Sequence, residues 1–104
     1  MNSGFERKSA IATNVLVTDD TLIVDLEDGR TISVPLAWYP RLLHASREER
    51  NNWRLIRKGE GIHWPELDED LSVENILFGN ASGESQRSFQ RWLKKRQDRE
   101  PDVS

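Results

Sequence analysis

The residues best suited to metal chemistry are the acidic run Asp68, Glu69 and Asp70, which begins five positions after His63. Oxygen ligands at alternate positions suit Ca²⁺ or Mg²⁺, but the glycine and the distal glutamate of a calcium-binding loop are missing. The same carboxylates lie just before Ser72, a predicted helix start, where negative charge stabilises the helix dipole. We expect this structural role, no metal ion and no cofactor, and a metal-dependent enzyme is the weakest alternative.

Other signatures of catalysis are missing from the sequence. The chain has two histidines and no cysteine, which excludes disulfides and thiolate metal sites. Neither histidine accompanies a nucleophile motif such as G-x-S-x-G. Gly59-x-Gly61 lacks the third glycine and the strand–helix context of a phosphate-binding loop. We therefore expect that the protein is not an enzyme, and that His63 is a packed or hydrogen-bonded strand residue.

Aromatic side chains gather in the middle of the chain, in the run Trp38-Tyr39-Pro40-Arg41 and again at Trp53 and Trp64. Aromatic faces beside arginine can stack on bases or on peptides. Alternatively, Trp38 and Trp53 bracket a helical segment and hold it against a sheet. We favour this packing role, and a partner groove between the rings stays open as an alternative.

The best candidate for a binding surface is a helix predicted over residues 86–99. Its apolar side chains recur three and four positions apart, so they form one stripe. Such a stripe can enter a groove of a partner protein, its charges can contact phosphates, or the helix can fold back on its own sheet. The stripe and the basic residues around it are Phe89, Trp92 and Leu93 with Arg87, Arg91, Lys94, Lys95 and Arg96.

Length and composition allow one small domain. The chain has 104 residues, a hydrophobic share of 36% and a mean hydropathy of -0.73, and its four tryptophans can compensate for the small apolar content. No apolar run approaches the roughly 18 residues that a membrane span needs, and the first ten residues lack the apolar core of a signal peptide. We expect a cytoplasmic protein with no membrane contact.

The charge is divided unevenly along the chain. Residues 1–79 carry a net charge of -5, whereas residues 80–104 carry +2. Basic tails often bind other molecules, although charged terminal helices also occur for solubility alone. We expect a flexible segment over residues 1–9, one domain over residues 10–79, and a basic amphipathic helix and tail over residues 80–104.

The domain begins with a pattern typical of β-strands. Alternating apolar residues from Ile11 onward, and the turn dipeptide Asp28-Gly29, predict an antiparallel three-stranded meander that Pro35 ends. A second, shorter hairpin is predicted from residues 54–57 and 62–64. In its second strand Ile62 and Trp64 share one face, while His63 points to the other.

Short helices should cover the apolar face of the meander. Pro40 suits the first turn of a helix in which Leu42 and Leu43 face inward. Ser46 and Glu49 form a capping box for the next helix, and a further helix runs from Ser72 to Gly79. The predicted fold class is therefore α+β: an antiparallel meander and a short second hairpin, packed with short helices and followed by a C-terminal helix.

Several ordered segments between Ala12 and Gly79 resemble domain-of-unknown-function family 2442, which is typified by the N-terminal domain of a Nitrosomonas protein. They are DGR from Asp28, VPLAWYPRLLHA from Val34, EERNNW from Glu48 and GIHWPELDEDLSVENILFG from Gly61. The residues that carry the resemblance are Trp38, Tyr39, Pro40, Arg41, Trp53, His63, Trp64, Asp68, Glu69 and Asp70.

The resemblance implies a small bacterial α+β protein with no assigned enzymatic activity. It also implies an antitoxin-like role, since many family members are encoded beside another short protein in toxin–antitoxin pairs. Some members carry a C-terminal helix-turn-helix domain, but the residues after Gly79 suffice for one helix and not for a three-helix DNA-binding unit.

The leading hypothesis is a non-catalytic, antitoxin-like protein that binds a cognate small protein from a neighbouring gene and helps to regulate its operon. The alternative is a nucleic-acid-binding regulator that uses the basic C-terminal helix. A homodimer would bring two such helices together and favour DNA binding.

Overall fold

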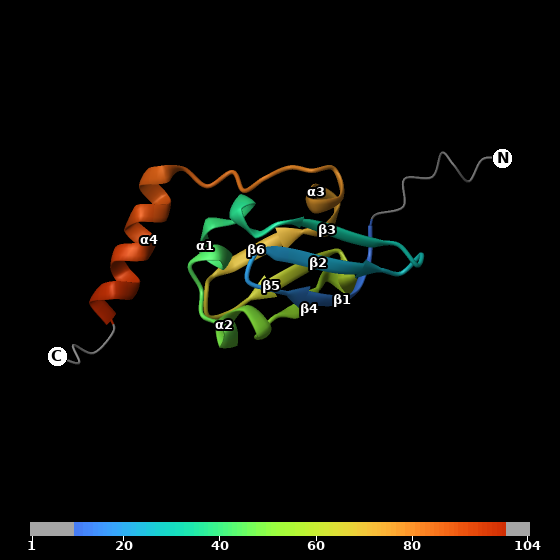
Figure 1. Cartoon of the computed structure of the whole chain (residues 1–104), viewed down its shortest axis with the longest axis horizontal. Helices are drawn as coiled ribbons and strands as arrows, with labels where there is room; N and C mark the ends of the chain where they lie inside the picture. Colours follow the sequence, from blue (N-terminus) through green and yellow to red (C-terminus); the bar gives the residue numbers. More distant parts are fainter. Residues whose placement is uncertain (1–9, 100–104) are drawn as a thin grey trace.

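The computed structural model describes residues 10–99. The segment 1–9, predicted to be flexible, and residues 100–104 of the predicted tail lie outside this range. Figure 1 shows two antiparallel sheets facing each other, with helices at both ends of the domain. Side chains from both sheets and from the helices form one buried cluster, so residues 12–76 share a single hydrophobic core.

The first sheet is the predicted meander. Its strands pair in the order β1-β2-β3, with Leu22 opposite Val34 and Val24 opposite both Val15 and Ile32. Alternate residues of β2 point into the core. The Asp28-Gly29 turn is confirmed, and Gly29 adopts a φ of 97°. The strands are β1 (Ala12–Val17), β2 (Thr21–Leu26) and β3 (Thr31–Pro35).

The second sheet contains the predicted hairpin and one further strand. As predicted, Ile62 and Trp64 are fully buried and His63 is half-buried on the other face. The third strand was not predicted from the sequence, because half of its residues are acidic and Leu71 is its only large apolar residue. The strands are β4 (Arg54–Ile56), β5 (Gly61–Trp64) and β6 (Glu69–Ser72), paired in that order.

A close contact at Gly59 brings the two sheets together. Gly59 ends the short 3₁₀ helix η3 (Arg57–Gly59) between β4 and β5. A Cβ atom there would lie 2.8 Å from the carbonyl oxygen of Ala12 in β1, and the residue has a φ of +92°. Both observations require glycine, so the Gly59-x-Gly61 pattern reflects backbone packing.

Three short helical turns follow the meander. Pro40 begins α1 as predicted, and Ser46 and Glu49 form the predicted capping box of α2. Leu42 is fully buried, but the prediction for Leu43 was wrong, because this side chain is 38% exposed. Successive side chains on a helix point about 100° apart, so only one of the two can face the core. The turns are η2 (Leu36–Trp38), α1 (Pro40–Leu43) and α2 (Arg47–Asn51).

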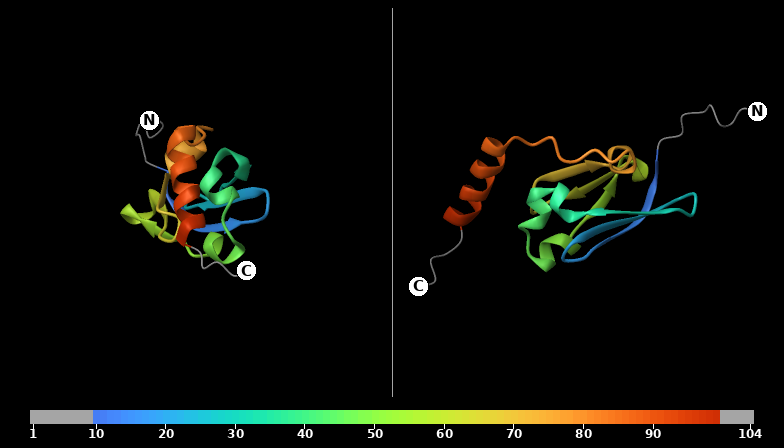
Figure 2. Two further views of the ribbon diagram at one scale, coloured as in Figure 1. Left: turned by 90° about the vertical axis from the view of Figure 1, so that its left-hand side faces the viewer. Right: turned by 45° about the horizontal axis from the view of Figure 1, so that its top comes forward.

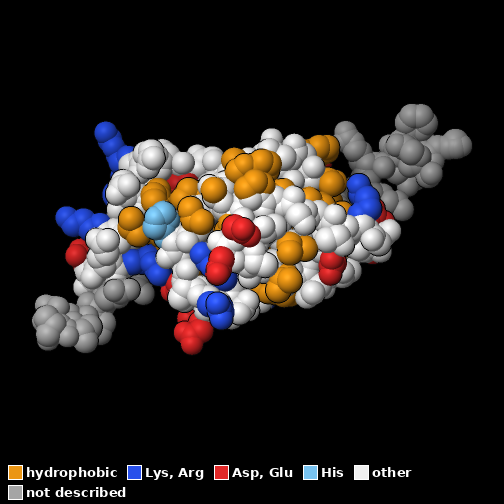
Figure 3. All heavy atoms as spheres, in the orientation of Figure 1, with side chains coloured by type: hydrophobic (Ala, Val, Ile, Leu, Met, Phe, Trp, Pro, Cys, Tyr) orange, Lys and Arg blue, Asp and Glu red, His pale blue; other side chains and the backbone are white. Residues whose placement is uncertain are grey.

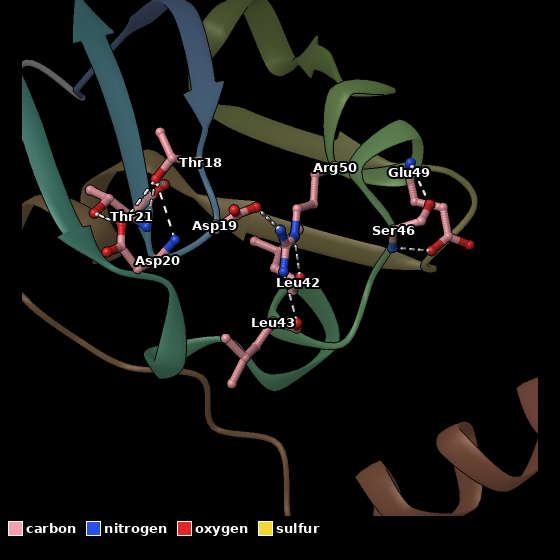
Figure 4. A network of polar contacts seen from close by, with 9 residues as sticks. All are labelled: Thr18, Asp19, Asp20, Thr21, Leu42, Leu43, Ser46, Glu49 and Arg50. Carbon is pink, nitrogen blue, oxygen red and sulfur yellow. Dashed lines mark hydrogen bonds and ion pairs between the residues drawn. The ribbon is translucent and has the colours of Figure 1, made fainter.

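Arg50 connects these helices to both sheets (Figure 4). Its side chain is only 9% exposed and donates to the carbonyl oxygens of Leu42 (2.9 Å) and Leu43 (2.8 Å) at the end of α1. It also reaches Asp19 in the β1–β2 turn, at 3.3 Å. The backbone oxygen of Arg50 accepts the indole N–H of Trp64 at 3.0 Å. Each buried polar group in this junction therefore has a partner.

The last two helices occupy opposite ends of the domain. Ser72 caps α3 (Val73–Leu77) as predicted, and Gly79 and Asn80 donate to its last carbonyl groups. A strap, defined here as residues 80–85, then crosses the domain to α4 (Gln86–Arg99), which has the predicted bounds. In Figures 1 and 2, α4 lies beside the end formed by α1 and α2 and covers neither sheet. Within residues 10–99, no helix has the length and apolarity to span a bilayer.

Trp64 is the largest fully buried side chain, and its loss should destabilise the whole domain. We expect Trp64→Phe to lower the free energy of unfolding by about 1–3 kcal/mol, because the variant leaves a cavity and an unsatisfied Arg50 carbonyl. Urea denaturation measures this difference. Trp53→Phe, at a partly buried ring, is the matched control and should have the smaller effect; equal losses would contradict the role assigned to Trp64.

Candidate functional site

The apolar stripe of α4 packs against its own domain. Phe89 is only 7% exposed, and its ring centroid lies 5.1 Å from that of His44 and 5.7 Å from that of Trp92. Trp92 and Leu93 are half-buried on the same side of the helix. The helix therefore folds back, but onto the α1–α2 end and not onto a sheet as the sequence analysis had considered. Phe89 and Trp92, predicted as partner contacts, are engaged within the chain.

Arg41 holds the helix and the strap in place. Its Nε and Nη2 atoms donate to the Glu84 carboxylate at distances of 2.6–3.1 Å. Nη1 donates to the carbonyl oxygens of Leu67 and Asp68, and the guanidinium lies 5.1 Å from the Trp92 ring centroid. The bonds to Glu84 raise the pKa of Arg41 and lower the pKa of Glu84. One side chain thus joins α1, the β5–β6 turn, the strap and α4.

A second ion pair fixes the far half of α4. Arg96 donates to both carboxylate oxygens of Glu49, at 3.0 and 2.9 Å, and its guanidinium lies 4.9 Å from the Trp92 ring centroid. Glu49 also accepts from the backbone N–H of Ser46 in the α2 capping box. The pKa of Glu49 is lowered, chiefly by Arg96. Because Glu49 caps its own helix, α4 is attached to a rigid element.

The outer face of α4 is basic. Four of its cations are exposed, and none of them belongs to an ion pair between residues of the described range. In Figure 3, Lys and Arg side chains project at the end of the molecule where α4 lies. We call these four exposed residues the basic face: Arg87, Arg91, Lys94 and Lys95.

A hollow of about 580 Å³ separates part of this face from the domain. Arg91 and Lys95 lie on its helical side, while Glu66 and Asp68 of the β5–β6 turn lie on the other side. All four side chains are exposed. Opposite charges thus face each other across an open groove, which can accept a polar chain that carries charges of both signs.

The aromatic run serves packing and attachment of the strap. Tyr39 is 2% exposed and donates from its hydroxyl group to the carbonyl oxygen of Asn80, at 3.3 Å. The Trp38 carbonyl accepts from the backbone N–H of Ser82 at 3.1 Å. Trp38 and Trp53 pack, partly buried, against the core, and Trp64 lies within it. The predicted packing role of these rings is therefore confirmed.

The acidic run does not converge on a metal ion. Asp70 pairs with Nδ1 of His63 in the neighbouring strand, and Asp68 occupies the turn with a φ of 52°. In the range that the structure covers, no three His, Cys, Asp or Glu side chains form a group that could hold a metal. His63 is a hydrogen-bonded strand residue, as predicted.

Glu69 was considered above only as part of the acidic run, and the structure gives it surroundings that the sequence did not reveal. It shares the inward-facing side of β6 with Leu71 and lines a small pocket of about 150 Å³ beneath the strap. Burial raises its pKa to about 7; Arg41 opposes this shift, whereas Glu84, Asp70 and Asp68 add to it. The alternation with Leu71 could have revealed its position, had β6 been predicted.

Comparisons with known proteins give a family and a fold. The family model described as "Protein of unknown function (DUF2442)" matches residues 12–82, a range that ends within the strap. A crystal structure of a protein of unknown function from Rhodospirillum rubrum ATCC 11170 is similar, with a TM-score of 0.66 and 27% identity. The similarity covers 76% of this chain and 98% of that one. No protein of curated function matches.

Replacing Arg41 should release α4 and leave the sheets folded. Lysine keeps the charge but lacks the planar fork, so Arg41→Lys cannot bind Glu84 and the two turn carbonyls together. We expect docking to weaken by roughly 1–3 kcal/mol, seen as faster amide hydrogen exchange in α4 with unchanged exchange in β2 and β5. Arg91→Lys on the basic face is the control, and equal exchange in both variants would exclude this role of Arg41.

The raised pKa of Glu69 predicts how stability depends on pH. The folded state holds this proton more tightly than the unfolded state, in which the pKa is near the ordinary glutamate value of 4.5. Stability should therefore fall as pH rises from 4.5 to about 7, by roughly 2–3 kcal/mol. Urea denaturation at several pH values measures this slope. Glu69→Gln should remove it and Asp70→Asn should retain it.

Proposed function

Since the chain belongs to the DUF2442 family, we propose that it is a non-catalytic, antitoxin-like cytoplasmic protein that binds a cognate protein partner through the basic face of α4. The observation that carries this proposal is the division of α4 into a docked aromatic face and a free basic face. A helix fixed on one side loses little conformational entropy when its other side binds. The partner surface that fits four cations is acidic.

The groove beside α4 favours a protein over a nucleic acid. A phosphate backbone that contacted Arg91 and Lys95 would also approach Glu66 and Asp68, which repel it. A protein segment can place acidic groups against the helix and basic groups against the turn. The net charge of -5 on residues 1–79 also weakens attraction to a polyanion.

Co-expression with the product of the neighbouring gene tests the proposal. We expect the two proteins to co-purify, and the double reversal R91E/K95E to weaken the complex about tenfold, because charged groups at an interface steer association. The matched control is R54E/K58E, which makes the same change in net charge at exposed positions outside α4. No co-purification, or equal loss in both variants, would contradict binding through the basic face.

A nucleic-acid-binding regulator is the second candidate, supported by the spacing of the basic face. Arg87, Arg91 and Lys94 follow one another at helical intervals of four and three, so they lie along one side of α4. If all four cations contact duplex phosphates, the logarithm of the binding constant should fall against the logarithm of salt concentration with a slope of about -3.6. Fluorescence anisotropy with duplex DNA and RNA measures it, and no binding at low salt removes this candidate.

A further inference from the structure

Glu69 is half-buried under the strap, and its carboxylate has no polar partner among the described residues. No hydrogen bond or ion pair within residues 10–99 involves its carboxylate. Strap residues 80–83 and Tyr39 line the same pocket, whose volume is about 150 Å³. An ionised carboxylate is costly in such a place unless it is paired. The closed strap therefore favours the protonated form.

The groups that face Glu69 cannot compensate its charge. Arg41 from α1 is the one cation near it among the described residues, while Asp68, Asp70 and Glu84 add negative charge from the turn, from β6 and from the strap. The buried Tyr39 hydroxyl group donates to Asn80 and not to Glu69. All three nitrogen atoms of the Arg41 guanidinium already donate, to Glu84, Leu67 and Asp68. An ionised Glu69 thus competes with Glu84 for a guanidinium in which a single N–H, on Nη2, has no acceptor among the described residues.

Few contacts oppose an opening of the strap. Besides the Arg41–Glu84 pair, they are the Tyr39 hydroxyl bond to Asn80, the Ser82 backbone bond to Trp38 and two bonds from Asn80 to Asn75 in α3. Release of α4 also breaks the Arg96–Glu49 pair and the contact between Phe89 and His44. Opening would hydrate Glu69 and move Glu84 away from it. We propose that the strap and α4 form a latch, which is closed while Glu69 is protonated and is released when Glu69 ionises.

The pKa of Glu69 in the closed and open states determines how opening of the strap depends on pH. In the closed state the pKa of Glu69 is about 7, and in the open, hydrated state it returns toward 4.5. Opening therefore becomes more favourable as pH rises between these values, by up to about 300-fold. At low pH the closed state also depends on the ion pairs of Glu84 with Arg41 and of Glu49 with Arg96. The pKa values of both glutamates are lowered, so both pairs stay intact well below neutral pH.

The latch deepens the proposed function, because it controls the helix that carries the basic face. The biological role of the latch rests on the proposed function, but the movement of the strap and α4 does not depend on it. The position of α4 can be measured without any partner, so a failed co-purification leaves the latch intact, and an immobile helix leaves partner binding intact.

The test follows the indole N–H signal of Trp92 and the amide signals of residues 86–96 by NMR between pH 5 and pH 8. We expect these signals to move together toward undocked positions as pH rises, and to keep their docked positions in Glu69→Gln. Glu84→Gln should give undocked positions at every pH, which provides the reference. No movement in the natural chain, or the same movement in Glu69→Gln, would overturn the latch.

Two controls separate Glu69 from neighbouring titratable groups. Asp70→Asn removes the adjacent carboxylate that pairs with His63, and His44→Asn removes the imidazole ring that contacts Phe89. Both variants should retain the transition. If either one abolishes the transition while Glu69→Gln retains it, the titrating group is not Glu69 and the proposal is wrong.

Discussion

The arrangement of the C-terminal half depends on the Arg41 guanidinium. Its donors reach the strap and the β5–β6 turn, and its face lies over Trp92, so one planar group sets the position of three segments. Arginine suits this place because its fork can hold a carboxylate and backbone carbonyls at once. The neighbouring Glu69 makes the same position sensitive to protonation.

Arg50 has the corresponding role in the body of the domain. It satisfies the last carbonyl groups of α1, reaches the β1–β2 turn and accepts the Trp64 indole through its own backbone. Both arginines donate to backbone carbonyl groups, which for Arg50 lie at the end of α1 and for Arg41 lie in the β5–β6 turn. The short helices α1 and α2 are thereby rigid enough to receive α4.

Family membership and the docking of α4 concern different parts of the chain. The family model covers residues 12–82, which include Arg41, His44 and Glu49 on the domain side. Their partners Glu84, Phe89 and Arg96 lie beyond it. The shared domain thus offers a complementary surface to a helix that the family model does not describe, and this surface leaves the basic face of α4 free.

The sequence by itself determined the local elements: the meander, the helix caps at Ser46 and Ser72 and the bounds of α4 depend on residues a few positions apart. It could not reveal β6, whose acidic residues hide the alternation, nor the exposure of Leu43. Only the tertiary structure decided that Arg41 meets Glu84, 43 residues away, and that Arg96 meets Glu49, 47 residues away. Such pairs depend on how distant segments pack, and charge or hydropathy patterns do not specify which charges come together. For the same reason, the burial of Glu69 and the free face of α4 emerged only from the folded chain.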